Sequence, residues 1–197
     1  MKIEMKEAFD KYFDRLNKSY KAAFNTRPRT CLPNDVDIDK RLIVSEEDED
    51  GYVEWAPVKI EKRPSLLNIE KELGFSLSAE LKDFYLTYLF GKLEGTVGDI
   101  DLYFYKMYSI NNLEKKIKQE YADGQWCFPN SQVFLIGDAC CGGIDNFFIY
   151  YDNEKQQLFI YDNEEGCEQR IDIKTSIAET IANMKPFFEK DLEHVNE

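Results

Sequence analysis

The residues that could carry out chemistry in this sequence are few, and the only histidine is His194. Catalytic triads, cysteine–histidine pairs and histidine metal sites all need a histidine that is held in a packed site. We expect residues 191–197 to form a flexible tail, so His194 is a poor candidate for catalysis. The common routes of nucleophilic catalysis are therefore disfavoured.

Adjacent cysteines followed by two glycines suggest a reactive or metal-binding turn at 140–143. No second pair with CxxC spacing is present to complete a zinc site, and neighbouring cysteines do not easily form an ordinary disulfide. We favour the end of a strand followed by a turn of small residues. An odd number of cysteines without paired spacing is unlike a secreted disulfide framework, which indicates a reducing cytosol. The five are Cys31, Cys127, Cys140, Cys141 and Cys167.

Carboxylates are the other candidates for chemistry. The run 46–50, followed by Gly51, partly imitates the start of a calcium-binding loop, but Pro57 stands where that loop needs a bidentate glutamate. Asp99 and Asp101 could suggest acid–base catalysis, although such pairs arise by chance in an acidic chain. We predict no metal site, no cofactor and no enzymatic activity. An enzyme that uses clustered carboxylates or the paired cysteines is the alternative.

The charge of the chain narrows the class of partner. There are 38 acidic and 25 basic residues, which give a formal net charge of −13. Nucleic acids and anionic lipids carry dense negative charge and should be repelled by this surface. A basic protein loop or a toxin is the natural complement, unless the acidity only maintains solubility.

The acidic positions fall in two separate stretches, each with an aromatic residue beside it. If the strands that carry them adjoin, they form one negative patch able to hold a basic loop, with added cation–π contacts of roughly 0.5–2 kcal/mol each. Trp55 is equally compatible with a place in the core. The predicted partner-binding residues are Glu46, Glu47, Asp48, Glu49, Asp50, Glu54, Trp55, Asp99, Asp101 and Tyr103.

Hydrophobic periodicity predicts the elements that position these residues. Helical spacing is found at 3–24, 66–73, from Ser78 to 89, 109–121 and from Ser176 to 184, where Ser176 and Glu179 have capping-box spacing. Strand patterns are found at 42–45, 52–58, 97–105, 133–136, 147–151, 158–161 and 170–173. We expect 42–45 and 52–58 to form a hairpin with an acidic tip, and 26–40 to be irregular. Because no long helical crossovers separate the later strands, the pattern favours an α+β fold with a mostly antiparallel sheet flanked by helices.

The ends of the sequence bear on location and domain limits. Residues 1–6 lack the apolar core of a signal peptide, and no apolar run approaches the roughly 20 residues that span a bilayer. We therefore predict a cytoplasmic protein whose membrane contact, if any, is peripheral. We expect a single domain over residues 1–190.

Several short segments, in this order, are similar to one known family. They are Glu54-Trp55-Ala56-Pro57, Phe84-Tyr85, Gly98-Asp99-Ile100-Asp101-Leu102 and Asn183-Met184-Lys185-Pro186-Phe187-Phe188. Together they resemble the Syd family, the SecY-interacting proteins of bacteria, within the SUKH superfamily. The acidic run 46–50 and the segment 140–143 are not part of that pattern.

The resemblance implies a Syd-like α+β fold with a concave acidic face and a non-enzymatic binding role. Syd proteins associate with the cytoplasmic side of the cell membrane by binding basic cytosolic loops of the SecY translocon. Other members of the superfamily are immunity proteins that neutralise toxins by binding them. The departures from the pattern leave a partner other than SecY open.

Overall fold

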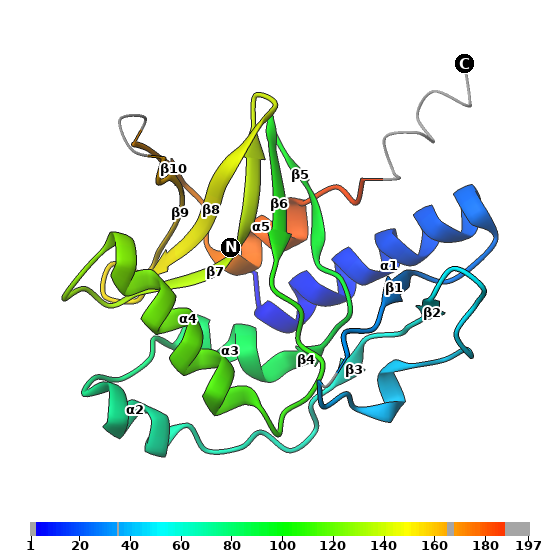
Figure 1. The fold of residues 1–197 in the computed structure, drawn as a ribbon, viewed down its shortest axis with the longest axis horizontal. Coiled ribbons are helices and arrows are strands. Elements are labelled where there is room, and N and C mark those ends of the chain that lie inside the picture. Colours follow the sequence, from blue (N-terminus) through cyan, green and yellow to red (C-terminus); the bar gives the residue numbers. More distant parts are fainter. Residues whose placement is uncertain (1–2, 35, 165–167, 188–197) are drawn as a thin grey trace.

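A long first helix and one large antiparallel sheet provide most of the secondary structure (Figure 1). The computed structural model describes residues 3–34, 36–164 and 168–187. The helices are α1 (Met5–Phe24), the 3-10 turn η1 (Lys40–Leu42), α2 (Leu67–Leu73), α3 (Ala79–Thr87), α4 (Leu113–Cys127) and α5 (Ile177–Asn183). The strands are β1 (Arg29–Cys31), β2 (Tyr52–Glu54), β3 (Val58–Lys59), β4 (Tyr88–Leu89), β5 (Glu94–Val97), β6 (Ile100–Phe104), β7 (Val133–Cys141), β8 (Ile144–Asp152), β9 (Gln157–Asp162) and β10 (Gln169–Ile173).

The main sheet has six antiparallel strands in the order β10-β9-β8-β7-β6-β5, so each strand lies beside its neighbour in the chain. Two further pairs, β1 with β2 and β3 with β4, form small separate sheets. Figure 1 shows the tips of the β5–β6 and β7–β8 hairpins projecting together beyond the helices. The predicted α+β class, with a mostly antiparallel sheet flanked by helices, is confirmed.

The helices bury the apolar stripes that the sequence predicts. In α1 the buried side chains include Phe9, Tyr12 and Phe13, which share one face at helical spacing. Phe9 stacks on Phe84 of α3, and Phe13 packs at a tilt against Phe90 of the segment after it. α1 also packs against α5, so elements from both ends of the sequence share one core.

The sheet carries apolar residues on both faces. Alternate residues of a strand point to opposite faces, and Phe134, Ile149 and Ile160 join the main core. Their neighbours Val133, Tyr150 and Phe159 form a second, smaller cluster on the other face, covered by Phe128 from the end of α4. Phe128, at the end of α4, therefore covers part of this second face, whereas Leu113 and Ile117 of the same helix belong to the main core.

One edge of the main sheet is closed by the chain itself. Thr96 of β5 forms an antiparallel bridge with Lys185, with backbone hydrogen bonds of 2.8 and 2.9 Å in the two directions. A Cβ atom on Gly95 would lie 2.8 Å from the carbonyl carbon of Lys185. The absence of a side chain at Gly95 is what lets the two backbones approach.

Several predicted boundaries are wrong. Residues 29–31, expected to be irregular, form β1, which pairs with β2. The strand predicted at 97–105 is interrupted by a turn at 98–99, where Gly98 has a φ of 60° and β5 passes into β6. α4 begins at Leu113 rather than at Ser109. The hairpin predicted from 42–45 and 52–58 is reduced to a single bridge between Ile43 and Trp55.

The other elements agree with the prediction. Ser78 caps α3, and Ser176 and Glu179 form the capping box of α5. β7 ends at Cys141, and Gly142 and Gly143 both have positive φ in the turn that follows, as we favoured from the sequence. The domain limit at residue 190 remains a prediction, since 188–197 lie outside the described residues.

Candidate partner-binding surfaces

The acidic run 46–50 forms an exposed loop ahead of β2, and its central carboxylate is used to shape it. Asp48 accepts hydrogen bonds from the backbone N–H groups of Asp50 (3.0 Å) and Tyr52 (2.9 Å). The same side chain makes an ion pair with Arg29 of β1. Asp48 therefore anchors the loop to the β1–β2 pair and has less freedom to contact a partner.

The four remaining carboxylates of this loop are exposed to solvent: Glu46, Glu47, Glu49 and Asp50. None of them forms an ion pair with a lysine or arginine in the described part of the chain. Four negative charges on adjacent positions repel one another, and a cation brought to the loop would reduce that repulsion. We call this the acidic loop, residues 46–50.

A small aromatic pocket lies next to the acidic loop. It has a volume of about 240 Å³ and is lined by Tyr20, Phe24, Arg29, Asp50, Tyr52 and Lys92. Phe24 is 51% exposed and Tyr52 is 38% exposed, and the Arg29 guanidinium lies 5.0 Å from the centre of the Tyr52 ring. The acidic loop is therefore bordered by aromatic surface.

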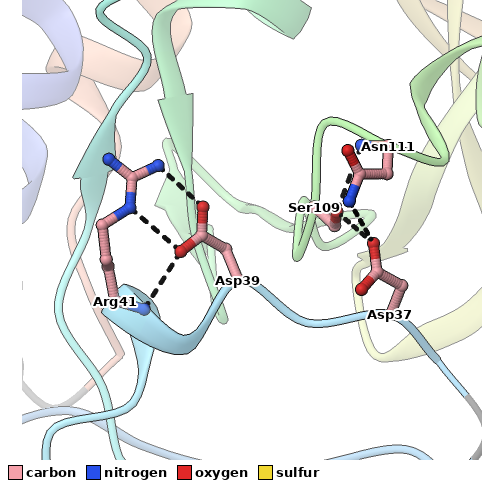
Figure 2. A network of polar contacts seen from close by, with 5 residues as sticks. All are labelled: Asp37, Asp39, Arg41, Ser109 and Asn111. Carbon is pink, nitrogen blue, oxygen red and sulfur yellow. Dashed lines mark hydrogen bonds and ion pairs between the residues drawn. The ribbon is translucent and has the colours of Figure 1, made fainter.

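A polar network holds the segment that leads to the acidic loop (Figure 2). Ser109 and Asn111 donate hydrogen bonds to Asp37, at 2.6 and 3.0 Å. These bonds hold the pKa of Asp37 below its usual value, because they stabilise the charged carboxylate. Asp39 caps η1 by accepting the N–H of Arg41 and also pairs with the guanidinium of that residue.

The second predicted acidic stretch lies on a different sheet. Asp99 is in the turn between β5 and β6, and Asp101 accepts a hydrogen bond of 2.6 Å from Thr96. Tyr103 is 38% exposed and its ring lies 5.1 Å from that of Phe187. Glu54, in β2, is half-buried.

The two stretches do not adjoin as strands. Among the described strands β2 pairs only with β1, whereas β6 lies between β5 and β7 in the main sheet. In Figure 1 the loop before β2 (cyan) lies near the end of α1, apart from the tip of the β5–β6 hairpin. The expectation of one continuous patch depended on neighbouring strands, and that condition is not met.

Trp55 belongs to the core. It is 1% exposed and packs edge-on against Phe13, with ring centres 6.0 Å apart. Contact between Trp55 and a partner, one of the two roles considered from the sequence, is therefore contradicted by its burial. The exposed tryptophan is Trp126, at 87%.

A cross-strand row on the main sheet was not predicted. Tyr103, Asp138, Phe148, Tyr161 and Arg170 lie directly opposite one another on five successive strands and share one face. Asp138 accepts a hydrogen bond of 3.2 Å from Tyr105, and burial raises the pKa of its carboxyl group. The signal in the sequence that could have indicated Asp138 is its place as the one charged residue in the apolar run 133–141.

A buried carboxylate on α4 was also missed. Glu120 is 3% exposed, accepts a hydrogen bond from the hydroxyl group of Tyr85 and pairs with Lys116 at 2.6 Å. Burial raises the pKa of Glu120, and Lys116 opposes that effect. The group lies at a cavity of about 450 Å³ beside α4. Because its partners enclose it, Glu120 links α4 to α3.

The described residues offer neither a metal site nor a membrane-spanning helix. Within residues 3–34, 36–164 and 168–187 there is no group of three or more histidine, cysteine or acidic side chains placed to hold a metal ion. Over the same residues no helix has the length and apolar character needed to cross a bilayer. His194 and Cys167 fall outside those ranges.

Comparison with models of known protein families shows the superfamily to which the chain belongs. The model of the Syd protein family (SUKH-2) matches residues 6–119, and that of the SMI1 / KNR4 family (SUKH-1) matches residues 65–183. Each match covers more than half of the 197 residues. A search of curated proteins found no match. The chain belongs to the SUKH superfamily, with matches to both its Syd and its SMI1/KNR4 families.

Proposed function

We propose that this chain is a non-enzymatic binding protein that docks its acidic surface on basic cytosolic loops of the SecY translocon. The proposal places it in the cytoplasm, in peripheral contact with the membrane through that partner. The observation that carries it is the acidic loop, in which four exposed carboxylates have no basic partner among the described residues. The match to the Syd family supports SecY as the partner.

The structure suggests how the loop would bind. Asp48 and Arg29 fix its backbone, so little ordering is needed when a partner arrives. The four free carboxylates would attract lysine and arginine side chains, and Tyr52 and Phe24 would contact their aliphatic stems. Asp99, Asp101 and Tyr103, on the β5–β6 hairpin, would form a separate second contact.

Binding of peptides that copy the basic SecY loops tests this proposal. Fluorescence anisotropy should show binding that weakens steeply as salt rises, because contacts between exposed charges are screened. Neutralising the acidic loop in a fourfold variant (Glu46→Gln, Glu47→Gln, Glu49→Gln, Asp50→Asn) should reduce affinity at least about fourfold, at roughly 0.2–1 kcal/mol for each exposed pair.

A matched control separates the effect of charges in the acidic loop on affinity from the effect of net charge. Changing Glu7, Glu114, Glu154 and Glu168 to glutamine alters the charge equally, from −13 to −9, at exposed positions outside the loop. This control should retain most of the affinity. Equal losses in the two variants would show that only overall charge matters, and absence of binding at low salt would reject SecY loops as the partner.

An immunity protein that neutralises a bacterial toxin is the second candidate. The match to the SMI1 / KNR4 family over 65–183 favours it, because the superfamily includes toxin immunity proteins. A toxin encoded by a neighbouring gene should then be inhibited by the purified chain in a stoichiometric complex. A toxin that keeps full activity in the presence of excess chain would exclude this candidate.

A further inference from the structure

The two edges of the main sheet differ. The β5 edge is closed by the bridge from Thr96 to Lys185, whereas β10 has one strand partner, β9, in the part of the chain that the structure describes. On its outer side no strand, bridge or backbone hydrogen bond from the described residues reaches β10. An edge strand turns every second N–H and C=O group outward, where another strand can pair with it.

The two charged side chains of β10 flank its central residue. Arg170 and Asp172 are exposed on one face, on either side of Ile171, which points to the other face and packs partly on the core. In one chain these two charges form an ion pair of 2.7 Å. A strand with a positive and a negative charge on either side of its midpoint is complementary to an antiparallel copy of itself.

We propose that a second copy of this chain pairs with β10, strand against antiparallel strand, about a two-fold axis at Ile171. In this register Arg170 of each copy lies opposite Asp172 of the other copy, which gives two such pairs, and Ile171 lies opposite Ile171. The result is one continuous sheet of twelve strands, six from each copy. Opposed residues lie about 4.5–5.5 Å apart at Cα in such a pair, close enough for direct contact.

Alternative registers are disfavoured by the same charges. Shifting the axis to residue 170 brings Arg170 opposite Arg170, and shifting it to 172 brings Asp172 opposite Asp172. Like charges directly opposite each other destabilise a strand pair. In the Ile171 register, opposed residues are both odd-numbered or both even-numbered. A residue whose N–H and C=O groups point outward therefore lies opposite another residue of that kind. Charge therefore favours the Ile171 register over the two registers whose axes lie at residues 170 and 172.

The strength of the association follows from its size and charge. A strand of five residues buries little surface, so we expect a weak dimer, with a Kd in the micromolar range or above. Two copies of net charge −13 repel at long range. At about 0.15 M salt the Debye length is about 8 Å, so that repulsion is screened while contacts between opposed strands persist.

Charge exchange on β10 tests the proposal by sedimentation equilibrium. The wild type should show a concentration-dependent dimer at about 0.15 M salt. Arg170→Asp and Asp172→Arg should each weaken association about tenfold or more, because each creates two pairs of like charge. The double variant R170D/D172R restores opposite charges in the same register and should dimerise again. Circular dichroism would verify that each variant folds.

Hydrogen exchange on the wild type provides a readout that needs no variant. The amide groups of residues 169–173 that face outward should exchange more slowly as protein concentration rises, whereas the Thr96 amide, already bonded to Lys185, should not change. A wild type that stays monomeric up to millimolar concentration would overturn the proposal. So would a dimer that the single variants leave intact, or one that the double variant fails to restore.

Discussion

Replacing Gly124 with alanine tests how closely α4 is seated on the sheet. Gly124 is a buried residue in the last turn of α4, against the first residues of β7. An added Cβ atom would overlap the carbonyl oxygen of Val133 and lie 2.9 Å from its carbonyl carbon. Both atoms belong to a strand backbone, so neither can swing aside as the end of a flexible side chain could.

Two effects of opposite sign decide the outcome. Alanine favours a helix over glycine by about 1 kcal/mol. Crowding a packed site by one carbon costs typically about 1–3 kcal/mol, and contact with fixed backbone puts this site at the upper end. We therefore expect Gly124→Ala to lower the free energy of unfolding by about 1–2 kcal/mol. For a chain of this size that corresponds to a fall in Tm of about 2–8 °C.

Thermal and urea unfolding followed by circular dichroism measure the effect. The control is Ala122→Gly, an exposed position of the same helix, which isolates the helix-propensity term and should itself cost about 1 kcal/mol. If Gly124→Ala raises the Tm, propensity outweighs crowding and the close seating of α4 on β7 is refuted.

Three further outcomes follow from other described contacts. Wild type should lose stability relative to Glu120→Gln as pH rises from about 4.5 through the raised pKa of Glu120, because the folded state holds that proton more tightly than the unfolded state. Urea midpoints of both proteins across this pH range would test the prediction. Midpoints that change with pH in parallel for the two proteins would contradict it. Ser176→Ala should lower the free energy of unfolding by about 1 kcal/mol, because it removes half of the capping box. The shift in the urea midpoint measures this loss, with Thr175→Ala for comparison. An unchanged midpoint would mean that the cap contributes nothing to stability. Trp126→Phe should leave a protein whose fluorescence is blue-shifted and poorly quenched by acrylamide, since Trp55 is 1% exposed and Trp126 is 87% exposed; an emission that is readily quenched would place Trp55 at the surface.

Local features of the fold were predictable from the sequence. The aromatic stripe of α1, the Ser78 cap and the capping box at Ser176 each depend on residues within one or two turns. The paired glycines at 142–143 likewise marked the turn between β7 and β8, because a positive φ is accessible to glycine at little cost. These signals are short-range, so they could be interpreted without knowledge of tertiary contacts.

Features that depend on distant partners were not predictable. β1 contains only three residues and exists because β2 pairs with it. The burial of Trp55 depends on α1, and the enclosure of Glu120 depends on Tyr85 from another helix. Separation of the acidic loop from Asp99 and Asp101 is a matter of sheet topology, which the alternation of side chains does not encode.

The packing of α1 against α5 has a consequence for synthesis on the ribosome. The first helix emerges early, yet its partner helix, residues 177–183, is translated more than 150 residues later. Lys185, which completes the β5 edge, comes later still. Phe9 and Phe13 can pack on Phe84 and Phe90 as soon as those residues are made, but the face of α1 that contacts α5 stays uncovered until residues 177–183 have left the ribosome. Native packing of this core should therefore be completed late in synthesis.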